Sequence, residues 1–368
     1  MSNKFSSSGR APIDRFFSSS QEGRPAHSVT MGAYSYMLLG DVELGAQTSP
    51  SNMLIGRYSS LAGYLKFVTG MNHIYKNSVT HYPFDADEVL KDFTSYGKPY
   101  LLDAIPRSRS SDNHYQIIIG NEVWIGEGAT IVGGAKIGSG AIIGSNSVVT
   151  GYIPPYAVAV GNPARVVKYR FDEETIKKLL AIKWWNWDVD KVCANVHKMY
   201  DVEKFLAEHY QPELSIIPED SLGKEVEQFR ADGFKVYAFI ADFHVEYPLW
   251  RRVVSGFLKS NLTNAVLLFF LGEGVTNKDL DDMKIEEMKN FPSTIEKINN
   301  MPIILRVSSI DGKIFSPHAL RKSTHFITNR ELITLECLEY LHDTDVKIIS
   351  AMDDGIFDGE PLVDWNKV

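Results

Sequence analysis

Aliphatic residues recur at every sixth position over a long stretch of the first half of the chain. From residue 119 the sequence reads IGNEVW, IGEGAT, IVGGAK, IGSGAI, IGSNSV and VTGYIP. A period of six fits neither the helical repeat of about 3.6 residues nor the alternation of a single strand. The pattern therefore predicts a coil of short strands with an aliphatic interior and small residues at the bends. The first positions of the hexads are Ile119, Ile125, Ile131, Ile137, Ile143 and Val149.

The same register is present upstream and is interrupted by a long polar segment. The earlier positions are separated by multiples of six, so we expect the coil to begin near residue 30. Between 77 and 116 the pattern fails, and polar, aromatic and proline residues replace it. A long segment without repeat character inside a solenoid usually covers a site or forms a subunit contact. The earlier positions in register are Met31, Met37, Ile55, Leu61 and Phe67.

Two helices are predicted directly after the coil. Asp172 is a suitable N-cap for a helix that has acidic residues in its first turn and aliphatic residues up to Ile182. A second helix is predicted from about Asp188. We expect Cys193 to be a core residue on its apolar face. The other members of that face are Val189, Val192, Val196 and Tyr200.

The second half of the chain alternates strand-like and helical runs. The runs are KVYAFIADF, LWRRVVSGFLKS, NAVLLFFLG, MPIILRV, STHFIT, RELITLECLEYLHD and VKIISAM. Such alternation predicts a small α/β domain with a mostly parallel sheet. We therefore expect a polar N-terminal segment (1–27), a β-solenoid (28–169, with the loop 77–116), a helical tail with linker (170–212) and an α/β domain (213–368).

Composition and charge restrict the class of protein. With 44% hydrophobic and 23% charged residues, the chain has the composition of a soluble globular protein. The net charge of −8 is the sum of +3 over residues 1–200 and −11 over residues 201–368, and the acidic second half argues against a nucleic-acid partner. No apolar run has the length of a membrane span, and the start does not read as a signal peptide, so we expect a cytoplasmic protein. The distant Cys193 and Cys337 indicate neither a disulfide framework nor a zinc site.

Several motifs together resemble the hexapeptide-repeat xenobiotic acetyltransferases, which include chloramphenicol and streptogramin acetyltransferases of the hexapeptide type. The motifs are the hexads, Asn72-His73 before a loop containing Tyr82-Pro83-Phe84, NEVWIG at 121–126, GNPA at 161–164 and the Trp-rich tail at 170–187. The resemblance covers about residues 28–200. It implies a left-handed parallel β-helix followed by a helical tail, and a homotrimer that binds acetyl-CoA between neighbouring coils.

The resemblance also assigns a catalytic base, because His73 matches the position of that residue in the family. An imidazole near its ordinary pKa removes the proton of an acceptor hydroxyl while the oxygen attacks the thioester. Neither cysteine lies in the coil, which favours direct attack over an acyl-enzyme. Without the resemblance, His73 would be interpreted as a structural histidine in a turn, with its ring nitrogens hydrogen-bonded and no catalytic role. We expect His81 to line a pocket or the surface.

Cofactor contacts are implied along the coil. Trp124 corresponds to a residue close to the base in relatives, although packing on a coil edge would also explain it. The small residues Gly144 and Ser145 fall beside the pantetheine arm, whereas Glu127 departs from the small residue usual there. Thr150 matches a further contact. Gly151 stands where many relatives have a lysine.

Positive charge after the coil and aromatic residues near the loop complete the implied site. Arg165 and Lys168 are placed to neutralise the nucleotide phosphates, or are solvated charges at the coil end. Tyr36 and Tyr82 are our choices for acceptor contacts, because their rings combine an apolar face with a polar tip. Plain packing is the alternative for both. Tyr34, Tyr58 and Tyr64 offer similar surfaces.

The sequence thus favours an acetyl-CoA-dependent O-acetyltransferase. An appended α/β domain suits an enzyme that modifies a carbohydrate or surface polysaccharide. An antibiotic O-acetyltransferase and a non-catalytic trimeric scaffold are the alternatives. A γ-type carbonic anhydrase requires three histidines around zinc, and His73, His81 and His114 lack the paired spacing, so we expect no metal. The acceptor, the acyl group and the role of the α/β domain stay open.

Overall fold

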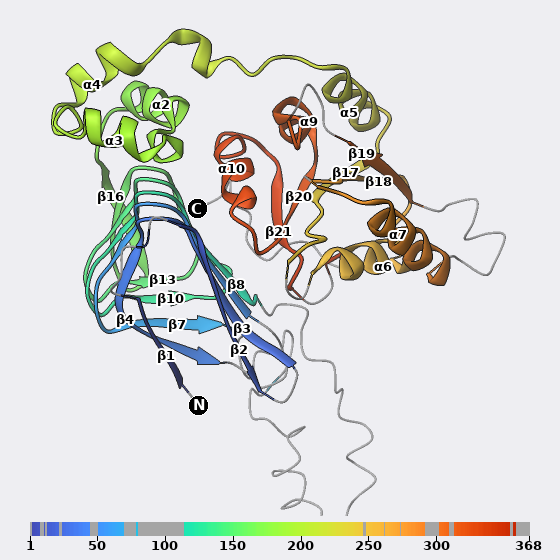
Figure 1. Cartoon of the computed structure of the whole chain (residues 1–368), viewed down its shortest axis with the longest axis horizontal. Coiled ribbons are helices and arrows are strands. Elements are labelled where there is room, and N and C mark those ends of the chain that lie inside the picture. Colours follow the sequence, from blue (N-terminus) through green and yellow to red (C-terminus); the bar gives the residue numbers. More distant parts are fainter. Residues whose placement is uncertain are drawn as a thin grey trace, which may run out of the picture.

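The structure, a computed structural model of the chain, describes residues 2–7, 11, 13–21, 24–44, 51–69, 79, 114–245, 248–260, 262–272, 274–290, 302–308, 313–353 and 356–357. A coil of stacked strands stands beside an α/β sheet (Figure 1). Helices α2, α3 and α4 lie along one edge of the coil, and the chain then crosses to α5 at the start of the α/β sheet.

The coil has three faces, because from β5 onward each strand pairs in parallel with the strand three places later. Face 1 consists of β6 (Ser60–Leu61), β9 (Trp124–Ile125), β12 (Ile142–Ile143) and β15 (Ala157–Gly161), followed by the antiparallel β16 (Ala164–Tyr169). Face 2 consists of β7 (Leu65–Thr69), β10 (Thr130–Val132) and β13 (Val148–Val149). Face 3 consists of β3 (Arg24–Met31), β5 (Ser51–Ile55), β8 (Gln116–Ile119), β11 (Lys136–Ile137) and β14 (Tyr152–Ile153).

Three further strands belong to the first coil. The long strand β4 (Tyr36–Leu44) pairs with β6 at its start and with β7 at its end, so it joins face 1 to face 2. Strand β1 (Ser2–Ser7) runs antiparallel to β4, and β2 (Arg15–Gln21) runs antiparallel to β3.

The interior of the coil is the aliphatic stack that the hexads predict. All eleven first positions, from Met31 to Val149, are at most 2% exposed and belong to one apolar cluster. Glycine follows several of them because the next coil passes close by. A Cβ on Gly126 would lie 2.6 Å from the backbone nitrogen of Ser145, and one on Gly120 would lie 2.6 Å from that of Ser139. The prediction of an aliphatic interior with small residues at the bends is confirmed.

The helical tail covers the edge between face 3 and face 1. Asp172 caps α2 by accepting a hydrogen bond from the backbone nitrogen of Thr175 at 2.9 Å, as predicted. Trp184 contacts the ring of Tyr58 at a coil bend, with 4.9 Å between ring centroids. The elements of the tail are α2 (Glu173–Ile182), η2 (Trp184–Asn186), α3 (Val189–Asn195), α4 (Val202–His209) and η3 (Pro212–Ser215).

The apolar face predicted for the second helix is wrong. Cys193 is exposed, and Val196 and Tyr200 are 46% and 90% exposed. Helix α3 ends at Asn195, so Val196 and Tyr200 lie beyond it, and Cys193 lies on the exposed side of the helix itself. The buried residue of α3 is Asn195, whose side chain donates to the carbonyl oxygen of Lys191.

The second half contains a five-stranded sheet in which all strands are parallel, in the order β19-β18-β17-β20-β21. Apolar clusters fill both sides of the sheet. We refer to residues 221–357 as the α/β unit. Its elements are α5 (Ser221–Ala231), β17 (Lys235–Ile240), α6 (Trp250–Lys259), β18 (Ala265–Phe270), α7 (Asn277–Lys289), β19 (Ile303–Val307), α9 (Pro317–Lys322), β20 (His325–Thr328), α10 (Ile333–Glu339) and β21 (Lys347–Ser350).

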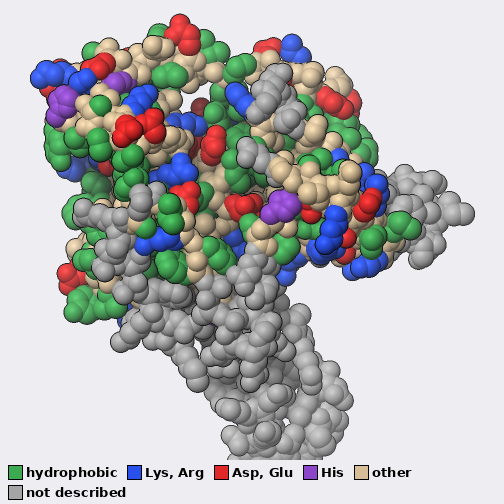
Figure 2. Space-filling model, in the orientation of Figure 1, with side chains coloured by type: hydrophobic (Ala, Val, Ile, Leu, Met, Phe, Trp, Pro, Cys, Tyr) green, Lys and Arg blue, Asp and Glu red, His purple; other side chains and the backbone are tan. Residues whose placement is uncertain are grey.

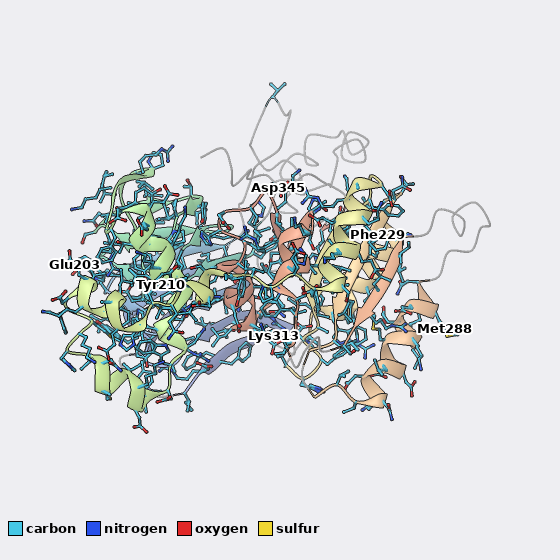
Figure 3. The ribbon with its side chains drawn as sticks, turned by 90° about the horizontal axis from the view of Figure 1, so that it is seen from above. Glu203, Tyr210, Phe229, Met288, Lys313 and Asp345 are labelled. Atoms are coloured by element: carbon cyan, nitrogen blue, oxygen red, sulfur yellow. The ribbon has the colours of Figure 1, made fainter. Side chains whose placement is uncertain are left out.

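The α/β unit packs against face 3. Leu54 and Ile118 point outward from the coil, yet they are at most 2% exposed, because Leu335 of α10 packs on them. Viewed from above, Asp345 lies between the helical tail, marked by Tyr210, and the far part of the α/β unit (Figure 3). A chain ending at 212 would leave this apolar surface uncovered. The boundary at 212/213 stays a prediction.

A buried glutamine connects the two parts through three hydrogen bonds and makes a fourth within the coil. The amide nitrogen of Gln116 donates to the side-chain oxygen of Asn52 at 3.1 Å and to the carbonyl oxygen of Asn329 at 2.7 Å. Its amide oxygen accepts from the hydroxyls of Thr328 at 2.6 Å and Ser350 at 2.8 Å. Gln116 is 3% exposed, so water cannot replace these partners.

In the view of Figure 2, basic and acidic side chains are interspersed on the described part of the surface. Among the described residues, no helix combines the length and the hydrophobicity of a transmembrane segment.

We predict that Gln116→Leu lowers the free energy of unfolding of the full chain by about 2 to 4 kcal/mol, because it leaves buried polar partners unsatisfied. Urea unfolding measures the change. Gln228→Leu, on the exposed side of α5, is the matched control and should change stability by less than about 0.5 kcal/mol. A Gln116→Leu protein as stable as the wild type would contradict the role of this network.

Candidate functional site

The predicted base and part of the predicted acceptor site lie outside the described residues. This applies to His73, His81 and Tyr82. The segment that contains them is joined to the end of β7 at Thr69 and returns to β8 through His114. Its two points of attachment therefore belong to face 2 and face 3.

The outward residues of face 1 form one continuous row. Trp124 is 53% exposed and pairs through its backbone with Ser60 on one side and Ile142 on the other. The row thereby brings three predicted site residues onto one surface, Tyr36, Trp124 and Lys168. In order across the sheet it is Tyr36, Ser60, Trp124, Ile142, Val158 and Lys168.

The bend between face 1 and face 2 holds the next predicted pair. Ser145 is exposed and Gly144 is partly buried. In the preceding coil the same bend contains the exposed Glu127, whose carbonyl oxygen accepts from the backbone nitrogen of Asn146 at 2.9 Å. A carboxylate thus stands one coil away from Ser145, which is unfavourable for a polyanionic cofactor close to that bend.

Thr150 and Gly151 stand apart from this pair, at the bend between face 2 and face 3, with strand β13 between the two bends. Thr150 is exposed. A Cβ built on Gly151 meets no atom within 4 Å, so the lysine that relatives carry at this position would fit here. The residues that the family resemblance assigns to cofactor binding therefore lie on face 1 and at two bends of the coil. They do not line a single pocket.

The two predicted phosphate-binding cations both lie on β16, at the end of face 1. Arg165 and Lys168 are exposed, and the guanidinium of Arg165 donates to the carbonyl oxygen of Ala164 at 3.0 Å. In the described parts of the chain, neither residue forms an ion pair with a carboxylate. Their positive charge is available to an anion.

Two of the alternative tyrosines are explained by packing. The rings of Tyr34 and Tyr58 stack with 5.0 Å between centroids, and Trp184 of the helical tail covers Tyr58. Burial is the largest contribution to the raised pKa of Tyr58. Tyr36 lies on face 1 and is partly buried, whereas Tyr64 is 69% exposed.

His114, one of the three histidines considered for a zinc site, contacts the carboxylate of Asp353. His114 Nδ1 lies 2.9 Å from Oδ2 of Asp353, which belongs to the α/β unit. Within the described ranges, no group of three or more histidine, cysteine, aspartate or glutamate side chains is arranged to hold a metal ion.

Three outward residues of the face 1 row were not among the site residues predicted from the sequence. Ser60, Ile142 and Val158 each directly precede an inward residue of the coil. The signal was available in the hexad register, because the residue before each first position points outward and every third hexad returns to the same face.

Comparisons with known proteins agree with the repeat. Residues 116–151 match the family described as bacterial transferase hexapeptide (six repeats). A chloramphenicol acetyltransferase of Agrobacterium fabrum is 31% identical over 147 residues, which cover 39% of this chain and 63% of the relative. A probable macrolide acetyltransferase of Lysinibacillus sphaericus is 35% identical over 145 residues, which cover 39% of this chain and 74% of the relative.

Solved structures give matches of similar extent. A maltose O-acetyltransferase from Clostridium difficile 630 is 24% identical with a TM-score of 0.24, and the match covers 39% of this chain and 60% of that one. A polySia-specific acetyltransferase is 23% identical with a TM-score of 0.28 and coverage of 47% and 63%. This chain spans less than two thirds of the Agrobacterium relative, and more than half of its own length has no counterpart there.

We predict that Gly151→Lys strengthens acetyl-CoA binding, because the position has room for the side chain and the cofactor carries phosphates. The dissociation constant should fall about two- to fivefold, as for an exposed ion pair, and the gain should disappear at high salt. Isothermal titration at two salt concentrations measures it. Gln228→Lys adds the same charge on α5 and should change nothing. Unchanged affinity in Gly151→Lys would place the cofactor away from this bend.

Proposed function

Since this chain belongs to the hexapeptide-repeat xenobiotic acetyltransferases, we propose that it is an acetyl-CoA-dependent O-acetyltransferase. The observation that carries the proposal is the hexad coil together with its similarity to named acetyltransferases. Acetyl-CoA acts as a co-substrate, and the mechanism below requires no metal.

The surface of the coil supports a cofactor site on face 1 and the bends that carry Ser145 and Gly151. The α/β unit covers face 3, and the helical tail covers the edge between face 3 and face 1. Face 1 keeps an exposed Trp124 and two exposed cations on β16. An apolar surface beside positive charge suits a cofactor with an apolar arm and phosphates.

We assign His73 as the general base. The imidazole takes the proton of the acceptor hydroxyl while the oxygen forms a bond to the acetyl carbonyl carbon. The carbon–sulfur bond then breaks, the acetyl ester is released, and the imidazolium returns its proton to the sulfur of coenzyme A. Oxygen attack in a ternary complex needs no covalent enzyme intermediate, and both cysteines lie outside the coil, with Cys193 in α3 and Cys337 in α10.

The proposal includes the handedness and assembly that the family implies. The coil is left-handed, and three copies assemble so that a neighbour completes each cofactor site. Exposed apolar residues such as Trp124 and Val160 on face 1 are consistent with a surface that a partner covers. The protein should then have three times the chain mass in solution by light scattering.

We propose a carbohydrate hydroxyl as the acceptor, since the α/β unit adds a large surface to one face of the coil and a glycan is an extended ligand. An antibiotic acceptor is the second candidate, because two relatives carry the names chloramphenicol acetyltransferase and macrolide acetyltransferase.

Replacing the base tests the mechanism. His73→Ala should lower the acetyl-transfer rate about 100- to 10,000-fold while acetyl-CoA affinity stays nearly unchanged, because the base acts on the acceptor. His81→Ala is the control and should retain most activity. The wild-type rate should rise with pH as the imidazole loses its proton, and this rise should be absent in His73→Ala. Loss of activity in His81→Ala alone would refute the assignment.

An acceptor panel separates the two candidates. Release of coenzyme A is measured with nucleotide-linked sugars, oligosaccharides, chloramphenicol and a streptogramin. We expect kcat/KM to be about 100-fold higher for a carbohydrate, as for a site built to pair its hydroxyls. A preference for either antibiotic would replace the carbohydrate proposal with the second candidate. No release with any hydroxyl acceptor would reject transfer itself.

A further inference from the structure

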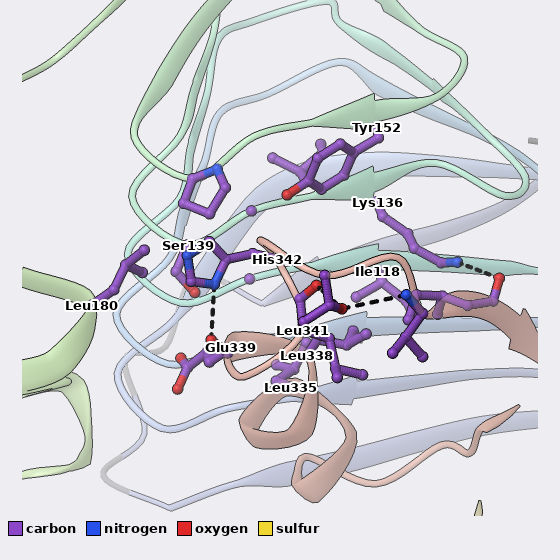
Figure 4. Close-up of a pocket in the computed structure, with 17 residues that line it drawn as sticks. Ile118, Lys136, Ser139, Tyr152, Leu180, Leu335, Leu338, Glu339, Leu341 and His342 are labelled. Carbon is purple, nitrogen blue, oxygen red and sulfur yellow. Dashed lines mark hydrogen bonds between the residues drawn. The ribbon is translucent and has the colours of Figure 1, made fainter. Parts of the chain in front are cut away.

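A pocket lies where the α/β unit meets face 3 of the coil (Figure 4). Its volume is about 90 Å³, several times the space that one water molecule needs. Face 3 forms one wall, and the segment from α10 through β21 forms the opposite one. Most of the lining is apolar. The aliphatic side chains that face each other across it are Ile118 on the coil and Leu335, Leu338, Leu341, Val346 and Ile348 on the α/β unit.

The coil wall of the pocket follows the plane of a parallel sheet. Its residues Ile118, Lys136 and Tyr152 follow one another across β8, β11 and β14. Gly138 adds no side chain to this wall, because a Cβ there would lie 2.5 Å from the backbone nitrogen of Pro155 in the next coil. A sheet wall that carries an aromatic ring suits a planar ring as occupant, since rings pack well in offset stacks.

The lysine of this wall has partners within the protein. Lys136 Nζ donates to the carbonyl oxygen of Ile348 at 3.1 Å (Figure 4). Burial lowers the pKa of Lys136 to about 7, and the nearby carboxylate of Asp353 opposes that shift. Tyr152 also interacts with another part of the protein. Neither side chain therefore needs a ligand as its polar partner.

The glutamate and the serine of the lining are likewise held by the protein. Glu339 Oε1 accepts from the amide nitrogen of Asn121 at 2.8 Å, and Oε2 lies 3.3 Å from Nζ of Lys183. The hydroxyl oxygen of Ser139 accepts from the backbone nitrogen of Asn121 at 3.1 Å. These contacts connect the coil, the helical tail and α10 with one another.

The two remaining polar side chains of the lining bond to the backbone of the α/β unit. His342 Nδ1 lies 2.9 Å from the carbonyl oxygen of Glu339, and a carbonyl accepts only, so Nδ1 donates. The hydroxyl of Thr344 donates to the carbonyl oxygen of Leu341 at 2.8 Å. His342 is exposed, so solvent can reach the rest of its ring.

These contacts restrict the chemistry of an occupant. A water molecule needs about three polar partners to be held well, and the polar side chains of this lining are engaged with the protein. A charged ligand would lose its hydration without gaining an unengaged counter-charge. The small volume excludes a long acyl chain or a nucleotide. A compact ring without charge meets all of these conditions.

We propose that the pocket between face 3 and the α/β unit binds a compact uncharged aromatic molecule, which apolar contacts from both walls hold in place. This inference is independent of the acetyl-transfer proposal, because the pocket lies on face 3 and the proposed transfer site lies on face 1. An occupant contacts both the coil and the α/β unit, so its binding stabilises their association.

Toluene is a suitable probe, and benzoate and benzylamine are rings of similar size with one negative and one positive charge. Isothermal titration of the full chain should give one toluene site per chain. Both charged rings should bind at least about tenfold more weakly, because each would bury a charge without a partner. No heat with toluene up to its solubility limit, or a charged ring that binds as tightly as toluene, would overturn the proposal.

A larger side chain in the wall tests the location. Leu338→Phe should fill part of the pocket and weaken toluene binding at least about tenfold. Leu280→Phe makes the same substitution in α7, outside the pocket, and should leave the affinity unchanged. A folded Leu338→Phe protein that binds toluene as the wild type does would overturn the location.

Xenon locates the site in the wild-type protein, so this test does not depend on how a variant folds. Xenon enters apolar cavities that hold water poorly. Crystals of the full chain kept under xenon pressure should show an atom between Ile118 of the coil and Leu335 of α10, and toluene should displace it. Xenon bound only elsewhere, or no bound xenon, would overturn the proposal.

Discussion

Close stacking of successive coils is the constraint on which the rest of this structure depends. An aliphatic side chain fills the interior at each hexad, and the bend leaves no space for a Cβ where the next backbone passes, as at Gly126 beside Ser145. Each strand is therefore fixed in register with its neighbours. Outward residues fall into straight rows, and the row from Tyr36 to Lys168 exists because the register is kept through six strands.

The three faces of the coil then acquire different roles through what covers them. The α/β unit buries Leu54 and Ile118 on face 3, and the Gln116 network makes that contact specific. Trp184 and its neighbours cover the adjoining edge. Among the described residues, face 1 keeps large exposed side chains, including Trp124. Among the described residues, face 1 thus presents an exposed apolar surface, whereas the α/β unit packs on face 3.

Sequence patterns predicted the coil interior and a helix cap well, but they did not predict the contact between the coil and the α/β unit. The hexad interior and the Asp172 cap follow from spacing and side-chain chemistry within a few residues. Cys193 was assigned wrongly, although it lies inside α3, because periodicity does not show which side of a short helix the rest of the protein covers. Nothing in the sequence indicates which face receives the α/β unit, since contacts such as Thr30 with Arg330 join residues 300 positions apart. The role of His73 rests on the family motif, because a lone histidine after a strand has no distinctive pattern.

We propose that acetyl-CoA binds along face 1 and the bends that carry Ser145 and Gly151, and that it leaves face 3 closed. Hydrogen–deuterium exchange of the full chain, with and without saturating acetyl-CoA, tests it most directly. We expect slower amide exchange in peptides that contain β9, β12, β15 and β16, and unchanged exchange in β8 and β11 on face 3. Protection confined to β8 and β11, or no protection anywhere in the coil, would contradict the account.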